Sequence, residues 1–364
     1  MAAVAAGFRR TPLYAAHRAL GATMTEFAGW EMPLQYTGVV AEHMAVRRAV
    51  GLFDVSHMGV LLAAGPNAES VLNLLLTNDV ARLHPGHAQY TLICNEHGGV
   101  VDDLVLYRIE PSVFMLVVNA ANTQKDFDWI AAHADKPVVL QNVSAQTAGL
   151  ALQGPRAPDV LPEAAALDRF AVGRFQIDGC GCWVARTGYT GEDGFELFCS
   201  AGDAEKLWSA LLERGSPFGI VPAGLGARDS LRLEMCYPLY GHELDEQTTP
   251  LEAGLSRFVA FDKGEFTGRS RLRAQRQTCV ARQLIAFCMD AKAPLPRAGC
   301  TISAQGRAVG TVTSGSFSPA LGAGIGMGYV APAFAAPGTR LEIEIRGRSY
   351  PAVVKPKPLL QNRK

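Results

Sequence analysis

The segment Gly98–Tyr107 constrains the fold most strongly, because it places two adjacent carboxylates inside an aliphatic run. Its sequence, GGVVDDLVLY, has the composition of a strand that enters the protein interior. An ionised carboxylate in such surroundings costs free energy unless it is paired or hydrogen-bonded. The segment therefore predicts a buried strand that carries an acidic site at Asp102 and Asp103.

The two acids are expected to face different environments, because neighbouring residues of a strand point to opposite faces of its sheet. On the face of Asp102 we expect Val100, Leu104 and Leu106. On the face of Asp103 we expect Val101, Val105 and Tyr107. The acids are then poorly placed to share one proton. One of them can cap the turn at Gly98-Gly99 while the other points into a pocket.

Length and charge balance limit the classes of protein that this chain can represent. At 364 residues it exceeds one comfortable hydrophobic core, so two or three domains are expected. Lysines plus arginines total 34, as do aspartates plus glutamates, which leaves no electrostatic footprint for nucleic acid or an anionic membrane. We therefore expect neither as a partner.

The cysteines and the apolar segments predict a reduced protein without a metal or a membrane span. Of eight cysteines, only Cys180 and Cys182 are close in sequence, and no second pair completes a zinc-binding spacing. No apolar run reaches the ~18 residues that cross a bilayer. Residues 1–10 lack the charged segment and apolar core of a secretory signal. We expect a cytoplasmic location with mostly buried thiols.

Hydrophobic periodicity predicts two α+β units and a β-rich tail. In the unit 51–139 the expected elements are a strand over 51–62, a helix over 66–76, a hairpin of strands 89–94 and 100–108, a strand over 114–119 and a helix over 121–134. A second unit spans about 140–260, with a helix expected over 157–166. The charged segment Lys263–Arg282 is expected to be a solvated linker. The tail alternates short strands with Gly/Pro turns, which is typical of a small β-barrel or sandwich.

Three other residues stand in unusual chemical surroundings. Met58 ends the polar segment Asp54-Val-Ser-His-Met, where a soft apolar side chain suits an adaptable pocket wall. Glu196 follows an acidic glycine turn and lies between Phe195 and Leu197, and Arg228 lies in the opening turns of a helix. Two interpretations stay open for Glu196 and Arg228. They form a buried ion pair, or the carboxylate accepts two parallel N–H bonds from an amino-pyrimidinone edge while the guanidinium orients it or meets the ring carbonyl.

The glycine-rich segments do not support a dinucleotide site. Gly224-Leu-Gly226 opens a helix but lacks the third glycine of the dinucleotide fingerprint, and Gly322–Gly328 lies in the β-rich tail. We therefore expect neither a flavin nor NAD. No phosphate-loop, Gly-x-Ser-x-Gly or His-Glu-x-x-His motif occurs.

Taken together, these segments resemble the glycine cleavage T-protein family of folate-binding aminomethyltransferases. The resemblance extends in order over nearly the whole chain, through the stretches Thr11–Tyr14, Phe27–Trp30, Gly51–Met58, Gly98–Leu104, Leu152–Pro155, Gly188–Glu196, Arg228–Glu234, Tyr240-Gly241, Asp245–Pro250, Thr311–Gly315 and Met327–Val330. Several of these motifs are long enough to be specific.

The resemblance implies an α+β fold of three domains around a central folate cavity. Two domains would be α+β, one formed by 1–50 with 140–275 and one by 51–139, and residues 280–364 would form a β-barrel-like domain. The implied reaction passes the aminomethyl group from the lipoyl arm of H-protein to tetrahydrofolate, giving 5,10-methylenetetrahydrofolate, ammonia and dihydrolipoyl H-protein. We expect a monomer when the protein is free.

The resemblance also assigns roles to residues. The second aspartate of the pair, Asp103, would be catalytic, and Glu196 with Arg228 would bind the pterin. The remaining positions that match the lining of the folate cavity are Met58, Tyr90, Val117, Asn119 and Tyr189. One departure is the tail Lys355–Lys364, which has no aromatic residue where the family commonly carries one near the folate.

Two related activities are alternatives. A folate-dependent demethylase of a small methylated substrate would share the pocket but use a different one-carbon donor. A non-catalytic folate-binding factor of iron–sulfur assembly characteristically has a cysteine in a Lys-Gly-Cys-x-x-Gly motif, whereas this chain has glutamate there, in Lys263-Gly-Glu265-Phe-Thr-Gly268. Basic residues around Arg269–Arg276 are a candidate surface for an acidic partner, with a solvated linker as the alternative.

Overall fold

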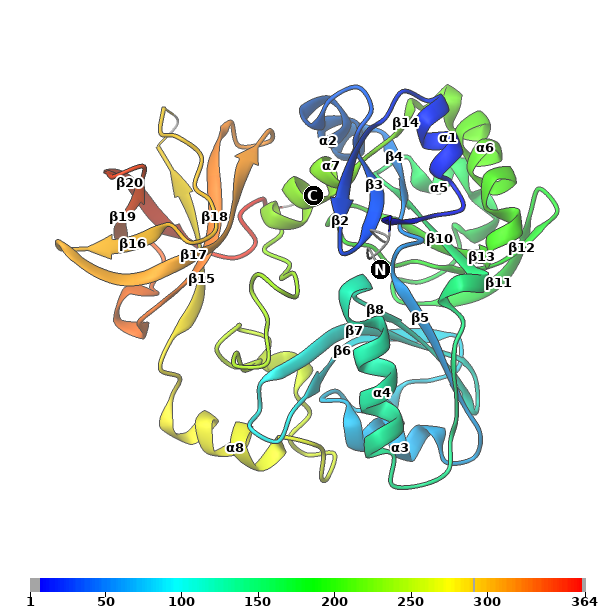
Figure 1. Ribbon diagram of the computed structural model, residues 1–364, viewed down its shortest axis with the longest axis horizontal. Helices are drawn as coiled ribbons and strands as arrows, with labels where there is room; N and C mark the ends of the chain where they lie inside the picture. The colour runs from blue at the N-terminus through cyan, green and yellow to red at the C-terminus, as the bar shows by residue number, and fades with distance from the viewer. Residues whose placement is uncertain (1–6, 291, 362–364) are drawn as a thin grey trace, which may run out of the picture.

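The computed structural model describes residues 7–290 and 292–361, and its strands form four sheets. Residues 1–6, on which part of the secretory-signal prediction for residues 1–10 rests, lie outside the described part. Residues 362–364 of the tail lie outside it as well. Figure 1 shows three lobes: a barrel at the left, a helix-covered sheet at the upper right and a second sheet below it. The predicted α+β class is confirmed.

A six-stranded sheet forms the core of the upper right lobe in Figure 1. Its order is β11 (Val172–Ile177), β12 (Cys180–Ala185), β13 (Gly194–Ser200), β10 (Thr147–Gln153), β4 (Val50–Asp54) and β14 (Ile220–Pro222). One face packs against α5 (Ala157–Val160) and α6 (Ala204–Gly215). The other face packs against α2 (Val39–Arg48) and α7 (Leu225–Glu234). A helix expected over 157–166 is shorter than predicted, because the chain continues as the 3-10 helix η4 (Pro162–Ala164).

A small three-stranded sheet lies beside this lobe. Its strand order is β1 (Arg9–Arg10), β3 (Trp30–Gln35) and β2 (Thr23–Phe27). Helix α1 (Tyr14–Ala19) lies between β1 and β2 in the chain. Strand β3 contacts α7, and its Leu34 backbone lies so close to Gly224 that a side chain at that glycine would clash with it. This contact fixes the start of the helix that carries Arg228.

The lower lobe is built on a five-stranded antiparallel sheet. Its order is β6 (His87–Cys94), β7 (Val100–Glu110), β8 (Val113–Val118), β5 (Gly59–Ala64) and β9 (Val139–Asn142). Helices α3 (Ala68–Leu75) and α4 (Thr123–His133) cover one face over an aliphatic core. On the other face, Tyr107 and Met115 pack against Val172 and Phe198 of the six-stranded sheet. The two sheets are therefore in direct contact through a shared apolar layer.

The single strand expected over 51–62 is wrong. The structure divides it into β4 and β5, which belong to different sheets and are separated by the buried segment 55–58. Both halves are apolar and extended, so periodicity alone gives no sign of the break. Residues Asp54 and Ser56 make the turn: the Ser56 N–H donates to Asp54 Oδ1 at 2.9 Å.

The C-terminal strands close into an antiparallel barrel (Figure 1). In order they are β15 (Gln283–Met289), β18 (Ala323–Val330), β17 (Arg307–Ser318), β16 (Thr301–Ala304), β19 (Arg340–Ile345) and β20 (Arg348–Lys355), and β20 pairs with β15. The choice between barrel and sandwich is thus settled as a barrel. The charged segment before it is not only a linker, because Arg269–Thr278 forms helix α8. Leu272 of α8 packs with Cys94 at the end of β6.

The remaining regular elements are short 3-10 helices. They are η1 (Val80–Arg82), η2 (Ala120–Asn122), η3 (Ser144–Gln146), η5 (Ala201–Asp203), η6 (Ser216–Phe218), η7 (Ser256–Phe258) and η8 (Pro332–Phe334). Of these, η2 matters most for the site, because it follows β8 directly and turns the chain into α4.

Candidate functional site

Strand β7 carries both acids, but a bulge interrupts its alternation. In the pairing with β6, Asp103 lies opposite Leu92 and Asp102 opposite Ile93, whereas Cys94 lies opposite Val100, so that Val101 is an additional residue. Because a bulge adds one residue to the strand, side chains beyond it point to the face opposite the one that simple alternation predicts. Val101 accordingly packs with Leu104 and Leu106, not with Val105 and Tyr107. The predicted face partners Val100 and Val101 are therefore exchanged.

Asp102 is fully buried and holds the turn that follows β8. Its Oδ1 accepts hydrogen bonds from the side-chain amides of Asn119 at 2.9 Å and Asn122 at 2.7 Å, and its Oδ2 accepts from the Asn119 backbone N–H at 3.1 Å. The expectation that an acid caps the Gly98-Gly99 turn is wrong. Asn95 does so, because its Oδ1 accepts from the Gly99 N–H at 3.0 Å.

Asp103 is partly exposed and accepts two side-chain hydrogen bonds. Tyr90 donates its hydroxyl to Oδ2 at 2.8 Å, and Asn119 donates its amide to Oδ1 at 2.9 Å. Burial and the negative charge of Asp102 raise the pKa of Asp103 to about 7, against the lowering effect of these two hydrogen bonds. A carboxyl that titrates near neutral pH is suited to accept and return a proton.

The two acids are less separate than strand alternation predicts. The same side-chain nitrogen of Asn119 lies 2.9 Å from Oδ1 of Asp102 and 2.9 Å from Oδ1 of Asp103. The bulge and the turn into η2 bring this amide between the carboxylates. A change in the position of Asp102 therefore affects Asp103 through the Asn119 side chain, and a change in the charge of Asp102 affects it electrostatically.

Glu196 lies on β13, in the interior of the six-stranded sheet. Its Oε2 accepts hydrogen bonds from the hydroxyls of Thr187 at 2.6 Å and Tyr107 at 3.3 Å. Its Oε1 accepts no hydrogen bond from the described residues. Tyr107 belongs to β7, four positions beyond Asp103, so it connects the strands of the two predicted site acids. Strand spacing already placed Tyr107 on the face of Asp103, but its contact with Glu196 was not predicted.

Arg228, in the first turn of α7, is not paired with Glu196. Among the described residues no ion pair joins them, so the interpretation as a buried ion pair is not supported. Instead, the guanidinium lies over the ring of Tyr189, 4.8 Å from its centroid, and Nη1 is buried without a hydrogen-bond partner. Burial lowers the pKa of Arg228, and the charge of Glu196 opposes that effect. Both predicted pterin-binding groups thus have unused hydrogen-bonding capacity.

The remaining predicted residues share an unusual exposure pattern. Met58, Val117 and Asn119, like Asp103 and Glu196, are each partly exposed between two buried neighbours. Water therefore reaches each of these side chains, although the chain on either side of it is buried. Tyr90 and Val117 lie opposite Val105 from its two sides, so these three side chains form a row across the five-stranded sheet.

Two further side chains border the Arg228 region. Tyr189 donates its hydroxyl to the carbonyl of Pro238 and stacks on Tyr237, with ring centroids 5.7 Å apart. Met58 packs against the cluster beneath α7. Its neighbour His57, which the sequence did not single out as a site residue, is buried, and its Nδ1 has no hydrogen-bond partner in the described part of the chain. Burial and the positive charge of Arg228 lower the pKa of His57 to about 4. His57 is therefore neutral at physiological pH.

The chain end packs on α7 without an aromatic residue. The N–H groups of Leu359 and Leu360 donate to the Glu234 carbonyl at 2.9 and 3.1 Å. Leu359 packs with Leu233 and Cys236. In the described part of the tail, leucines thus cover the end of the helix that carries Arg228.

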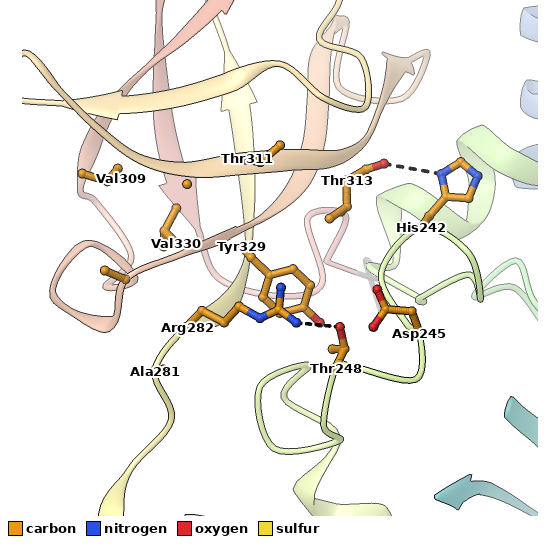
Figure 2. A pocket seen from close by; sticks show the side chains of 12 residues that line it. His242, Asp245, Thr248, Ala281, Arg282, Val309, Thr311, Thr313, Tyr329 and Val330 are labelled. Carbon is orange, nitrogen blue, oxygen red and sulfur yellow. Dashed lines mark hydrogen bonds between the residues drawn. The ribbon is translucent and has the colours of Figure 1, made fainter. Parts of the chain in front are cut away.

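A separate cleft lies between the barrel and the loop that leads to it (Figure 2). Its volume is about 440 Å³. Arg282 donates to the Thr248 hydroxyl at 2.8 Å and lies over the ring of Tyr329, 4.6 Å from its centroid. None of the predicted site residues lines this cleft; its lining consists of His242, Asp245, Thr248, Ala281, Arg282, Val309, Gly310, Thr311, Thr313, Tyr329, Val330 and Ala331.

Residues 7–290 and 292–361 contain neither a cluster of metal ligands nor a membrane-spanning helix. No group of three or more His, Cys, Asp or Glu side chains there is arranged to hold a metal ion. No helix there combines the length and apolar character that crossing a membrane requires. The eight cysteines carry free thiols, and five of them are buried.

Comparison with known proteins gives consistent matches over nearly the whole chain. A family model described as the GCVT N-terminal domain matches residues 13–263, and one described as the glycine cleavage T-protein C-terminal barrel domain matches 282–361. The aminomethyltransferase of Desulforamulus reducens is 47% identical over 355 residues, covering 96% of this chain and 97% of that protein. That of Moorella thermoacetica is 48% identical over 349 residues, covering 94% and 95%.

A solved structure is similar to the same extent. The glycine cleavage system aminomethyltransferase T from Bartonella henselae superposes with a TM-score of 0.91 at 36% identity, covering 97% of this chain and 98% of that one. The agreement extends through all three lobes, including the barrel.

Proposed function

The chain belongs to the glycine cleavage T-protein family, and from that premise we propose that it is an aminomethyltransferase acting on tetrahydrofolate. The proposed donor is the aminomethyl group on the dihydrolipoyl arm of H-protein. The proposed products are 5,10-methylenetetrahydrofolate, ammonia and dihydrolipoyl H-protein. The observation that carries this proposal is the position of Asp103, held by Tyr90 and Asn119 on the sheet face that reaches Glu196 through Tyr107.

Glu196 and Arg228 are proposed to bind the pterin ring. One carboxylate oxygen of Glu196 is fixed by Thr187 and Tyr107, and the other accepts no protein hydrogen bond among the described residues. An amino-pyrimidinone edge offers the parallel N–H donors that such a carboxylate prefers. Arg228 Nη1, buried and unpartnered, supplies a donor for the ring carbonyl. Met58, Tyr90, Val117, Asn119 and Tyr189 are proposed to line the same cavity.

Asp103 is proposed to act on the folate nitrogens. The transfer breaks the carbon–sulfur and carbon–nitrogen bonds of the aminomethyl group and joins the carbon to two folate nitrogens. The two protons released by those nitrogens are balanced by formation of ammonia and the thiol. An anionic Asp103 orients the folate, accepts a nitrogen proton and stabilises positive charge that develops on the carbon. Holding both substrates together contributes as well, because the reaction then proceeds within one complex.

The proposal extends to the location of the protein, its oligomeric state, its cofactors and its domains. It describes a cytoplasmic protein, monomeric when free, that uses no metal, flavin or NAD. Its proposed domains comprise residues 1–50 with 140–275, residues 51–139 and residues 280–364. Two strands cross these bounds, because β4 pairs within the sheet of the first domain and β9 within the sheet of the second. Glu265 stands where the related iron–sulfur assembly factors carry cysteine, which favours the enzyme over that alternative.

A product assay with purified protein tests the function directly. The protein is incubated with tetrahydrofolate and aminomethylated H-protein, and 5,10-methylenetetrahydrofolate and ammonia are measured. Both products are expected, in equal amounts and at a rate that depends on the protein. A parallel reaction with small methylated amines replaces the H-protein donor. Absence of product from a loaded, native H-protein contradicts the proposal, and product from the methylated amines alone supports the demethylase.

A further inference from the structure

Helix α4 carries a buried carboxyl group that the proposed reaction does not use directly. The side chain of Asp126 is 0% exposed, and neither of its carboxyl oxygens accepts a hydrogen bond from a donor among the described residues. An ionised carboxylate in that position would lose its hydration without any compensating donor. The arrangement therefore requires a proton on Asp126.

The adjacent cation does not neutralise Asp126. Lys125 directs its ammonium group elsewhere, donating to the Val101 carbonyl at 2.6 Å and to the Tyr240 hydroxyl at 2.8 Å. Its charge lowers the pKa of Asp126 less than burial and the charges of Asp102 and Asp103 raise it, to about 11. The negative charge that acts most strongly on Asp126 is that of Asp102, which accepts a hydrogen bond at 2.7 Å from Asn122, one helical turn before Asp126. Two carboxyl groups in contact with no donor between them share one proton.

Asp102 itself is the acceptor in this arrangement. It already accepts hydrogen bonds from the side chains of Asn119 and Asn122 and from one backbone N–H. A proton on Asp126 adds a further donor to the same carboxylate. The shared proton thus leaves the pair with a single negative charge and fixes the amide of Asn119, which in turn lies 2.9 Å from Asp103.

We propose that Asp126 is a positioning residue whose carboxyl stays protonated at neutral pH, donates to Asp102 and so fixes the Asn119 amide that holds Asp103. This inference rests on the proposed function for its effect on turnover, but the protonation state itself does not. The charge of the Asp102–Asp126 pair also sets the titration of Asp103. A second negative charge on the pair would raise the pKa of Asp103, and loss of the charge on Asp102 would lower it.

Infrared difference spectroscopy of the resting protein tests the protonation state without substrate. Wild type is compared with Asp126→Asn at about pH 9, where Asp103 is ionised and gives no such band, and a carbonyl band of a protonated carboxylic acid is expected in wild type and not in the variant. Asp128→Asn is the matched control, because Asp128 lies on the same helix with an exposed carboxylate. Its removal is expected to change only carboxylate bands. Absence of a protonated-acid band that depends on Asp126 overturns the proposal, whether or not the protein has the proposed activity.

The pH dependence of turnover tests the positioning role. In Asp126→Asn, where the amide replaces the donor and no charge is lost, the acidic limb of the profile is expected to keep its wild-type midpoint. In Asp102→Asn, which removes a negative charge beside Asp103, the midpoint is expected at lower pH. Asp126→Leu lacks the donor and is expected to lose at least about tenfold in turnover, most of which Asp126→Asn retains.

A shift of the midpoint to lower pH in Asp126→Asn would show that a charge has been removed and would overturn the proposal. If Asp126→Leu does not fold, the infrared spectra and the Asp126→Asn profile still decide it. A protein that lacks the activity entirely contradicts the proposed function, while the infrared result continues to report on Asp126 alone.

Discussion

The hydroxyl of Tyr107 lies 3.3 Å from Oε2 of Glu196, although 89 residues separate them in the chain. Tyr107 follows Asp103 by four positions on β7, and Glu196 lies on β13 of the other sheet. A fully buried side chain therefore connects the strand proposed for catalysis with the strand proposed for pterin binding. The relative position of Asp103 and Glu196 is set by the packing of two sheets, not by a flexible loop.

Tyr107→Phe is expected to weaken binding of tetrahydrofolate while leaving the fold intact. The ring and its packing against Phe198 remain, and Glu196 keeps the hydrogen bond from Thr187. Loss of one hydrogen bond costs about 0.5–1.5 kcal/mol, which corresponds to a rise in Kd of roughly 2- to 13-fold. Titration calorimetry with tetrahydrofolate measures it. An unchanged Kd would mean that Tyr107 does not orient Glu196.

Glu196→Gln is expected to reduce affinity for tetrahydrofolate more strongly. The substitution keeps the size of the side chain but replaces a charged acceptor with a neutral one, and charge-assisted hydrogen bonds are worth about 1.5–3 kcal/mol. The predicted rise in Kd is roughly 10- to 150-fold. Glu205→Gln, at an exposed position of α6, is the matched control and is expected to bind as wild type does. Equal affinities for the two variants would remove Glu196 from the binding site.

Lys263→Met is expected to lower the stability of the lower lobe without a direct effect on the site. The ammonium group donates to the carbonyls of Asn73 at 2.6 Å and Asn78 at 2.8 Å, and so satisfies backbone groups around the end of α3. Leaving them unpaired costs about 1–3 kcal/mol. Urea unfolding followed by circular dichroism gives the difference in free energy. Arg273→Met on α8 is the control, because Arg273 is exposed and makes no hydrogen bond or ion pair with the residues that the structure describes. A stability loss no greater than that of the control would contradict this role.

Asp126→Asn is expected to raise stability, and by an amount that grows with pH. The native protein keeps a proton on Asp126, where the pKa is raised to about 11, while the unfolded chain releases it above about pH 4. Between those values the native state binds one proton more than the unfolded state, so the free energy of unfolding of wild type falls as pH rises. The fall is up to about 1.4 kcal/mol per pH unit, and the asparagine variant lacks it.

Urea unfolding of both proteins at several pH values, from about 5.5 to 8.5, measures this difference. Asp128→Asn is expected to show no growing difference, because that carboxylate is exposed in the native state. A difference between wild type and Asp126→Asn that stays constant across the range would mean that Asp126 is ionised in the native protein.

Much of the architecture was predictable because it depends on local patterns. The hairpin of β6 and β7 and the apolar strand β8 follow from alternation and a polar turn, and the barrel follows from regularly spaced short strands. The division of residues 51–62 between two sheets was not predictable, since β4 and β5 are both apolar and the interruption is buried. Periodicity describes a segment and not the sheet that it joins.

The site shows the same distinction between local and distant causes. The acidic pair was visible in the sequence, but the bulge at Val101 depends on how β6 and β7 pair. The contact of Tyr107 with Glu196 arises only when two sheets pack. Nothing in the sequence distinguishes Asp126 from an exposed carboxylate of a helix. Only its burial beside Asp102 indicates that its pKa is raised. The family resemblance identified the candidate residues, whereas the contacts between them required the structure.

The most direct test of the account compares Asp103→Asn with Asp102→Asn in steady-state kinetics and in melting curves. Asp103→Asn is expected to melt as wild type does and to lose about 10²- to 10⁴-fold in turnover, the usual contribution of a general acid–base group. Asp102→Asn disrupts a buried acceptor of three hydrogen bonds and is expected to lose about 1–3 kcal/mol of stability while retaining more activity. A fully stable but inactive Asp102→Asn, together with wild-type turnover by Asp103→Asn, would contradict the catalytic role of Asp103.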